Sequence, residues 1–138
     1  MILVDTSAWV EFDRGTGSAV DLRVQDAMRS GEVASCEPVL MEVLAGARDE
    51  VRAGRLRRLL TSFAWVPLEP VADFEGAARL YRQCRRAGVT PRGLTDCLIV
   101  TMALRSGSAL LAADVDFERI ARVVPLGLVH TECPDPVR

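Results

Sequence analysis

The sequence contains no lysine: its 17 basic residues are all arginine. This absence excludes a phosphate-binding P-loop lysine and Schiff-base chemistry, because both need a primary amine. His130 is the only histidine and lies near the C-terminus, which argues against a histidine-based metal site or a Ser-His-Asp triad. No G-x-G-x-x-G pattern follows the first expected strand, so a dinucleotide-binding site is also excluded. Any chemistry must therefore rely on other side chains.

Cysteine and aromatic residues are also few. The four cysteines are Cys36, Cys84, Cys97 and Cys133. None of them forms a C-x-x-C pair, which favours buried thiols over disulfides or a zinc site. Aromatic residues make up 5% of the chain, and Trp9 and Phe12 suit core or dimer contacts better than a platform for stacked bases.

Long hydrophobic runs are missing as well. No apolar stretch approaches the roughly 20 residues that a membrane-spanning helix needs. Met1 to Val4 leads straight into Asp5, without the charged and apolar regions of a signal peptide. With 49% hydrophobic and 26% charged residues over 138 positions, the composition is typical of one folded domain. We therefore expect a cytoplasmic protein with a single domain over residues 1–130 and a flexible, proline-containing tail over 131–138.

What the sequence does contain is a set of acids at the edges of apolar segments. Asp5 ends the first apolar run, Glu42 interrupts another, and Asp96 directly precedes a third. Asp114 directly follows the run 109–113, with Asp116 close behind it. Gathered in one pocket, these carboxylates would repel one another and be costly to desolvate, unless a hard divalent cation neutralised them. The pattern therefore indicates metal-dependent chemistry.

Short apolar segments alternate with helical patterns along the chain. We expect strands at 2–4, 33–36, 63–68 and 109–113, with a possible last strand at 123–126. Amphipathic spacing predicts helices near 8–12, 18–29, 37–45, 48–60, 73–86, 94–105 and 116–121. This alternation predicts an α/β fold, a three-layer α/β/α sandwich with a mostly parallel central sheet. Sites in such sheets lie beyond the carboxyl ends of the strands, where Asp5 and Asp114 are expected.

Each acid also has an ordinary structural explanation. Asp5 and Asp114 could cap the helices that follow them, and Asp96 could sit in a helix's first turn, where the dipole favours a carboxylate. Glu42 is harder to explain in this way, because it lies mid-helix among apolar neighbours. The arginines around 48–58 and 79–86 are interpreted mainly as solvated helix faces rather than a phosphate-contacting rim. Arg92, beside Asp96, is the expected exception.

The acids and their neighbours resemble those of PIN-domain nucleases, in particular the VapC-type toxins of bacterial toxin–antitoxin pairs. The resemblance rests on four motifs in order, which are MILVDTS at 1–7, PVLMEVLAG at 38–46, GLTDCLI at 93–99 and ADVDFERIA at 113–121. The chain departs from the family pattern at Ala112, where many members have Thr or Ser. A hydroxyl that could support a metal-bound water is therefore missing at this position.

The resemblance implies a PIN-like fold and Mg²⁺- or Mn²⁺-dependent endoribonuclease activity on structured RNA such as tRNA or rRNA loops. Its catalytic and metal-binding positions carry over onto this chain as Asp5, Glu42, Asp96 and Asp114, with Asp116 as an accessory metal ligand. Thr6 and Arg92 are expected to contact substrate. A cognate VapB-type antitoxin, an RNA substrate and a homodimer are the implied partners.

Two alternatives stay open from the sequence. A degenerate domain with the same acids could be a non-catalytic module that binds an Arg-rich partner peptide. A DNA-directed, structure-specific nuclease could also use such an acidic site, although the short chain offers no additional DNA-binding segments. For the ribonuclease, the lack of a nearby histidine favours water activated by the metal over an imidazole base.

Overall fold

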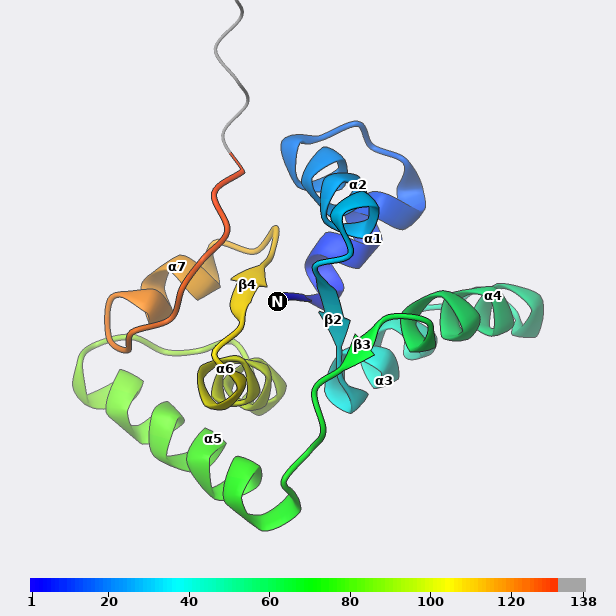
Figure 1. Ribbon diagram of the computed structural model, residues 1–138. Helices are drawn as coiled ribbons and strands as arrows, with labels where there is room; N and C mark the ends of the chain where they lie inside the picture. Colours follow the sequence, from blue (N-terminus) through cyan, green and yellow to red (C-terminus); the bar gives the residue numbers. More distant parts are fainter. Residues whose placement is uncertain (132–138) are drawn as a thin grey trace, which may run out of the picture.

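The core of the fold is a parallel sheet of four short strands. The structure is a computed structural model that describes residues 1–131, shown in Figure 1. The strands are β1 (Ile2–Val4), β2 (Val33–Ser35), β3 (Ala64–Trp65) and β4 (Ala109–Leu111). They pair in the order β3-β2-β1-β4, and each pairing is parallel. The predicted α/β class and parallel sheet are thereby confirmed.

Seven helices connect and cover these strands within residues 1–131. They are α1 (Thr6–Arg14), α2 (Ala19–Ser30), α3 (Glu37–Ala45), α4 (Glu50–Thr61), α5 (Pro70–Arg86), α6 (Leu94–Ser106) and α7 (Asp116–Ala121). Figure 1 shows α1 and α2 on one side of the strands and α5 and α6 on the other. With helices on both sides, every residue of β1 and β2 is buried, which explains why these strands are wholly apolar or small.

The strand order creates a switch point between β1 and β4. The chain leaves β1 through α1 and α2 and returns beside it as β2, whereas β4, reached through α5 and α6, pairs on the opposite edge of β1. Connections that depart in opposite directions leave a crevice beyond the carboxyl ends of the two strands. Asp5 follows β1 directly, and Asp114 follows β4 after two alanines. The fold therefore brings the two ends of the sequence to one crevice.

Two expected strands differ clearly from the structure, and the strand expected at 109–113 ends at Leu111. The last strand expected at 123–126 is wrong: that segment is a turn and irregular chain, and only Leu128 forms a single parallel bridge with Leu110. Pro125 has no N–H to donate to a ladder, which explains the irregularity. The strand expected at 63–68 shortens to two residues, although the Val66 amide still donates to the Ser35 carbonyl at 2.8 Å.

The remaining predictions about organisation have mixed outcomes. Cys36, Cys84 and Cys97 are free and buried as expected, whereas Cys133 lies outside the described residues. Apart from Thr131, the tail predicted over 131–138 also lies outside the described residues. The domain boundary at residue 130 stays a prediction. None of the helices within residues 1–131 combines the length and apolar character that crossing a bilayer requires.

Candidate metal centre

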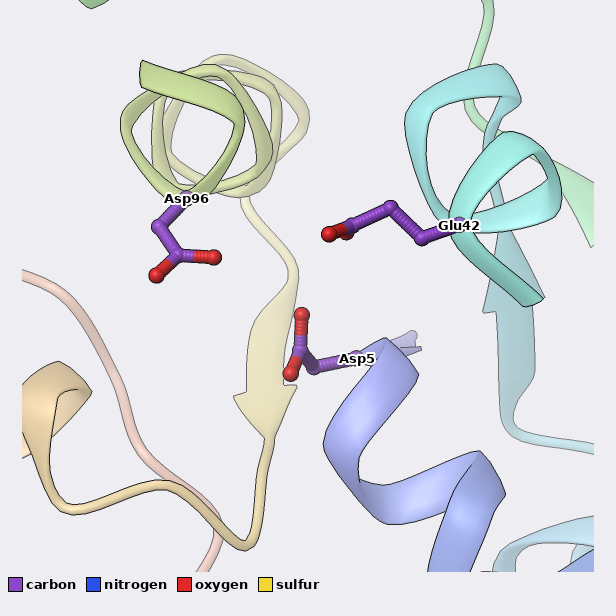
Figure 2. A group of neighbouring side chains, drawn as sticks. All are labelled: Asp5, Glu42 and Asp96. Atoms are coloured by element: carbon purple, nitrogen blue, oxygen red, sulfur yellow. The ribbon is translucent and has the colours of Figure 1, made fainter. Parts of the chain in front are cut away.

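Three carboxylates from distant parts of the sequence converge in the crevice. Asp5 precedes α1, Glu42 lies in α3, and Asp96 lies in the first turn of α6. Each offers one oxygen atom such that the three oxygens lie within 4.8 Å of one another. Figure 2 shows the three side chains pointing into the same space from three separate elements. Such spacing suits a single cation with several oxygen ligands.

Asp5 combines a structural role with an unused oxygen. Its Oδ2 accepts hydrogen bonds from the Ser7 amide at 3.0 Å and the Ser7 hydroxyl at 2.6 Å, so Asp5 is the N-cap of α1. Its Oδ1 is buried and has no hydrogen-bond partner in the described part of the chain. Buried polar atoms without partners are rare and costly. The helix cap proposed as an ordinary explanation is therefore real, but it accounts for only one of the two oxygens.

Ser7 also fixes the position of the crevice walls. Its hydroxyl accepts a hydrogen bond from the Ala113 amide at 2.9 Å, just after β4. The same hydroxyl thus connects Asp5 to the segment that carries Asp114. Ser7 is not among the site residues expected from the sequence. The Asp-Thr-Ser order at a helix start is nevertheless a signal for it, because a capping Asp commonly accepts a hydrogen bond from two residues ahead.

Glu42 is held by a neighbour from α1. The Thr6 hydroxyl donates to Glu42 Oε1 at 3.0 Å, across the contact between α1 and α3. Thr6 orients a carboxylate in this structure, and its predicted contact with substrate stays a prediction. Orientation of a candidate ligand by a second group is the usual arrangement around metal sites.

Burial and repulsion by neighbouring acids raise the pKa of all three carboxyl groups. Desolvation is the largest cause for each of them, and it raises the pKa of Asp5 and Glu42 above their usual ranges. Desolvation, together with repulsion by Asp5 and Glu42, raises the pKa of Asp96 to about 6. No ion pair within residues 1–131 involves any of the three. The charge of this acidic trio (Asp5, Glu42 and Asp96) is thus uncompensated by salt bridges from the described chain.

Asp114 and Asp116 lie at the edge of the same crevice but already have a cation beside them. Arg92 Nη1 contacts Asp114 Oδ2 at 3.0 Å, and Arg92 Nε contacts Asp116 Oδ2 at 3.3 Å. The negative charge of Asp114 also raises the pKa of Asp5 and Asp96, so the two groups of acids share one electrostatic environment. Arg92 thus pairs with acids of the crevice, and its expected contact with substrate phosphate stays a prediction.

A second hollow adjoins the acidic trio on its α3 side. This cavity of about 400 Å³ is bordered by Trp9 and Glu42 and includes the arginines Arg14, Arg48 and Arg52 in its wall. Arg52 forms an ion pair with Asp13, which leaves Arg14 and Arg48 as basic residues without an ion pair within the described chain. Trp9 itself is buried and stacks on Phe63, which confirms its predicted core role.

Residues 2–123 match the PIN domain family. The chain belongs to the PIN-domain family. This PIN domain is 44% identical to VapC ribonuclease Mb1587 of Mycobacterium bovis and to ribonuclease VapC11 of Mycobacterium tuberculosis. Each alignment spans 128 residues, or 91% of this chain and 96% of the relative.

A solved structure supports the fold of this PIN domain independently. VapBC2 from Rickettsia felis, bound to a DNA fragment from its promoter, aligns with a TM-score of 0.72 at 16% sequence identity. The alignment covers 94% of this chain and 98% of the other. The family match and the two relatives confirm the resemblance stated from the motifs.

The PIN domain thus brings Asp5, Glu42 and Asp96 into one group. Asp114 and Asp116 lie beside that group, paired with Arg92. The catalytic, metal-binding and substrate-binding roles assigned to these residues stay predictions.

Proposed function

We propose that this protein is a divalent-metal-dependent endoribonuclease that acts as the toxin of a toxin–antitoxin pair. The observation that carries the proposal is the acidic trio, whose three oxygens lie within 4.8 Å and whose charges have no cationic partner within residues 1–131. The 44% identity to two VapC ribonucleases supplies the reaction class. A VapB-type antitoxin as partner follows from the same relationship.

The residues of the crevice fit a hard divalent cation such as Mg²⁺ or Mn²⁺. Asp5 has a buried Oδ1 without a hydrogen-bond partner, and oxygen is the ligand type that both ions prefer. Asp5, Glu42 and Asp96 would hold the ion. When bound, such an ion lowers the pKa of an attacking water and offsets negative charge on a scissile phosphate.

Side chains around the acidic trio orient its carboxylates and supply positive charge for the substrate. Ser7 holds Asp5 through Oδ2 and thereby leaves Oδ1 available, while the Thr6 hydroxyl fixes Glu42. Asp5 is buried and Glu42 and Asp96 are partly buried, which reduces the screening of their charges by water and strengthens their attraction for a cation. Arg14 and Arg48, in the cavity beside Glu42, supply positive charge for phosphates that flank the cleaved bond. Looped or single-stranded RNA suits this crevice, because an attacking water needs access to a splayed backbone.

Cleavage of a tRNA or an rRNA-loop substrate tests the proposal. The wild type should cut with Mg²⁺ or Mn²⁺ and lose activity in EDTA, while Asp5→Asn and Asp96→Asn should lose at least 100-fold, roughly the cost of removing a key electrostatic group. Asp26→Asn is the matched control, since Asp26 is exposed on α2 and pairs only with Arg29 in the described chain. It should remain within about twofold of the wild type.

Undiminished cleavage in EDTA, or by either crevice variant, would contradict the proposal. Metal binding without cleavage of any RNA tested would favour the alternative of a non-catalytic acidic module. For the partner, the product of a short neighbouring reading frame should co-purify with this protein and abolish cleavage.

A further inference from the structure

The acids of the crevice divide into two groups by how their charge is balanced. The acidic trio has no ion pair with any residue of the described chain, whereas Asp114 and Asp116 share the guanidinium of Arg92. Arg92 uses two different nitrogens, Nη1 at 3.0 Å and Nε at 3.3 Å, and so bridges the two carboxylates. The guanidinium therefore lies between the two carboxylates and offsets negative charge on both of them.

The remaining oxygens of Asp114 and Asp116 also have partners. The Asp116 amide donates to Asp114 Oδ1 at 2.9 Å, and Arg119 Nη1 lies 3.3 Å from Asp116 Oδ1. The side chains of Asp114 and Asp116 are only 16% and 14% exposed. All four oxygens are therefore satisfied by the protein, in contrast to Asp5, whose Oδ1 is unpartnered.

The backbone presents Arg92 to these acids from a fixed position. Pro91 is buried, and α6 begins at Leu94, so the chain on both sides of Arg92 is anchored. The Arg92 side chain is nevertheless 70% exposed. The positive charge of Arg92 also acts on the acidic trio: it lowers the pKa of Asp96, whereas the neighbouring carboxylates raise it.

We propose that Arg92 takes the place of a second cation, so that the RNA-free protein binds one divalent ion at the acidic trio and none at Asp114 and Asp116. This inference rests on the proposed function, because it presupposes a metal centre. Two-ion nuclease sites hold their ions about 4 Å apart with carboxylates shared between them. Here a second ion would have to displace a bridging guanidinium. Arg92 is accordingly a positioning residue, which neutralises Asp114 and holds its carboxylate beside the metal centre.

Calorimetric titration with MnCl₂ tests the inference without RNA or activity. After removal of metal by EDTA and dialysis, the wild type should bind one Mn²⁺ per chain, and Arg92→Gln should bind two. Arg92→Lys retains the positive charge and should bind one. Arg119→Gln is the matched control: Arg119 contacts Asp116 but not Asp114, so the variant should also bind one. Electron paramagnetic resonance should show coupled Mn²⁺ ions only in Arg92→Gln.

Two results would overturn the inference alone: two ions in the wild type, or a single ion in folded Arg92→Gln. The wild-type stoichiometry is decisive even if a variant does not fold, and circular dichroism checks the folding of each variant. Absence of Mn²⁺ binding at millimolar concentration in both proteins would instead overturn the metal centre itself, and this inference with it.

Discussion

At the scale of single residues, the acidic trio makes the stability of the metal-free protein depend on pH. Desolvation and neighbouring carboxylates raise the pKa of Asp96 from 3.8 to about 6 and shift Asp5 and Glu42 in the same direction. Between pH 3.8 and about pH 6 the folded protein therefore binds more protons than the unfolded chain. Stability conferred by the protonated groups is therefore present at low pH and lost as the pH rises through about 6.

Asp96→Asn should thus stabilise the metal-free protein at neutral pH. Because it removes a repelled and partly buried charge, we expect a gain of about 1–2 kcal/mol at pH 7.5 in EDTA, after allowance for partial exposure. The melting temperature should rise by roughly 3–6 °C. Thermal unfolding at pH 4 should show a much smaller difference, because Asp96 is then protonated in the wild type. Equal melting temperatures at pH 7.5 would contradict this prediction, and Asp26→Asn serves as the exposed control.

At the scale of elements, the contact between α5 and α6 contains an ion pair whose carboxylate is buried and whose guanidinium is partly exposed. Arg105 Nε and Nη2 donate to the two oxygens of Asp73 at 2.8 Å each, and Nη2 also donates to the Pro67 carbonyl at 2.6 Å. The Asp73 side chain is 1% exposed, and the Arg105 hydrogen bonds hold its pKa below the usual range. This cluster connects α6 both to α5 and to the segment that leads out of β3.

Arg105→Met should therefore destabilise the fold strongly. Removing the cation leaves a buried carboxylate without its partner, which costs on the order of 3 kcal/mol. Urea denaturation should show this loss, whereas Arg79→Met should cost less than about 0.5 kcal/mol. Arg79 is a suitable control because it lies on α5 in an exposed pair with Glu75 at 4.0 Å. Similar losses in the two variants would show that the buried pair has no special role.

The elements also show how far sequence alone could reach. The helix expected at 116–121 is observed with the same bounds, and that expected at 94–105 ends one residue later, at Ser106. Glycine marks that end as the sequence suggested, since Gly107 adopts a positive φ of 69° there. The irregular segment 123–126 imitates a strand in the sequence because Val123, Val124 and Leu126 are apolar.

Within the site, sequence could indicate the acids but not their partners. Asp5, Asp96 and Asp114 lie at the edges of apolar segments and Glu42 interrupts one, and this pattern is visible in the sequence itself. The bridge from Arg92 to Asp114 and Asp116 depends on two loops meeting in space, as does the hydrogen bond from Thr6 to Glu42. Such contacts between elements have no local signature.

At the scale of the whole molecule, an apolar groove next to the crevice is the surface that suits the predicted homodimer. The groove, of about 470 Å³, lies between α3, α5 and the start of α6. Three large side chains on its border are more than half exposed: Met41, Phe74 and Leu94. Exposed apolar patches of this kind commonly mark protein–protein contacts.

Phe74→Glu should therefore yield a monomer. Placing a charge in an apolar interface without a partner is costly, so the pairing should be lost. Size-exclusion chromatography with light scattering should give twice the chain mass of 15.1 kDa for the wild type and the single mass for the variant. Leu22→Glu, at an exposed position on α2, should remain dimeric. A monomeric wild type would show the homodimer prediction to be wrong.

The pairing of β1 with β4 has a consequence for the newly made protein. Asp5 emerges early from the ribosome, but its surroundings are completed only when Leu110 pairs with Leu3 and Ala113 binds the Ser7 hydroxyl. Contacts between such remote segments form late and slowly in folding. Nascent chains and chains truncated before β4 therefore cannot assemble the crevice. Under the proposed function, synthesis therefore includes a delay in which each copy is still harmless.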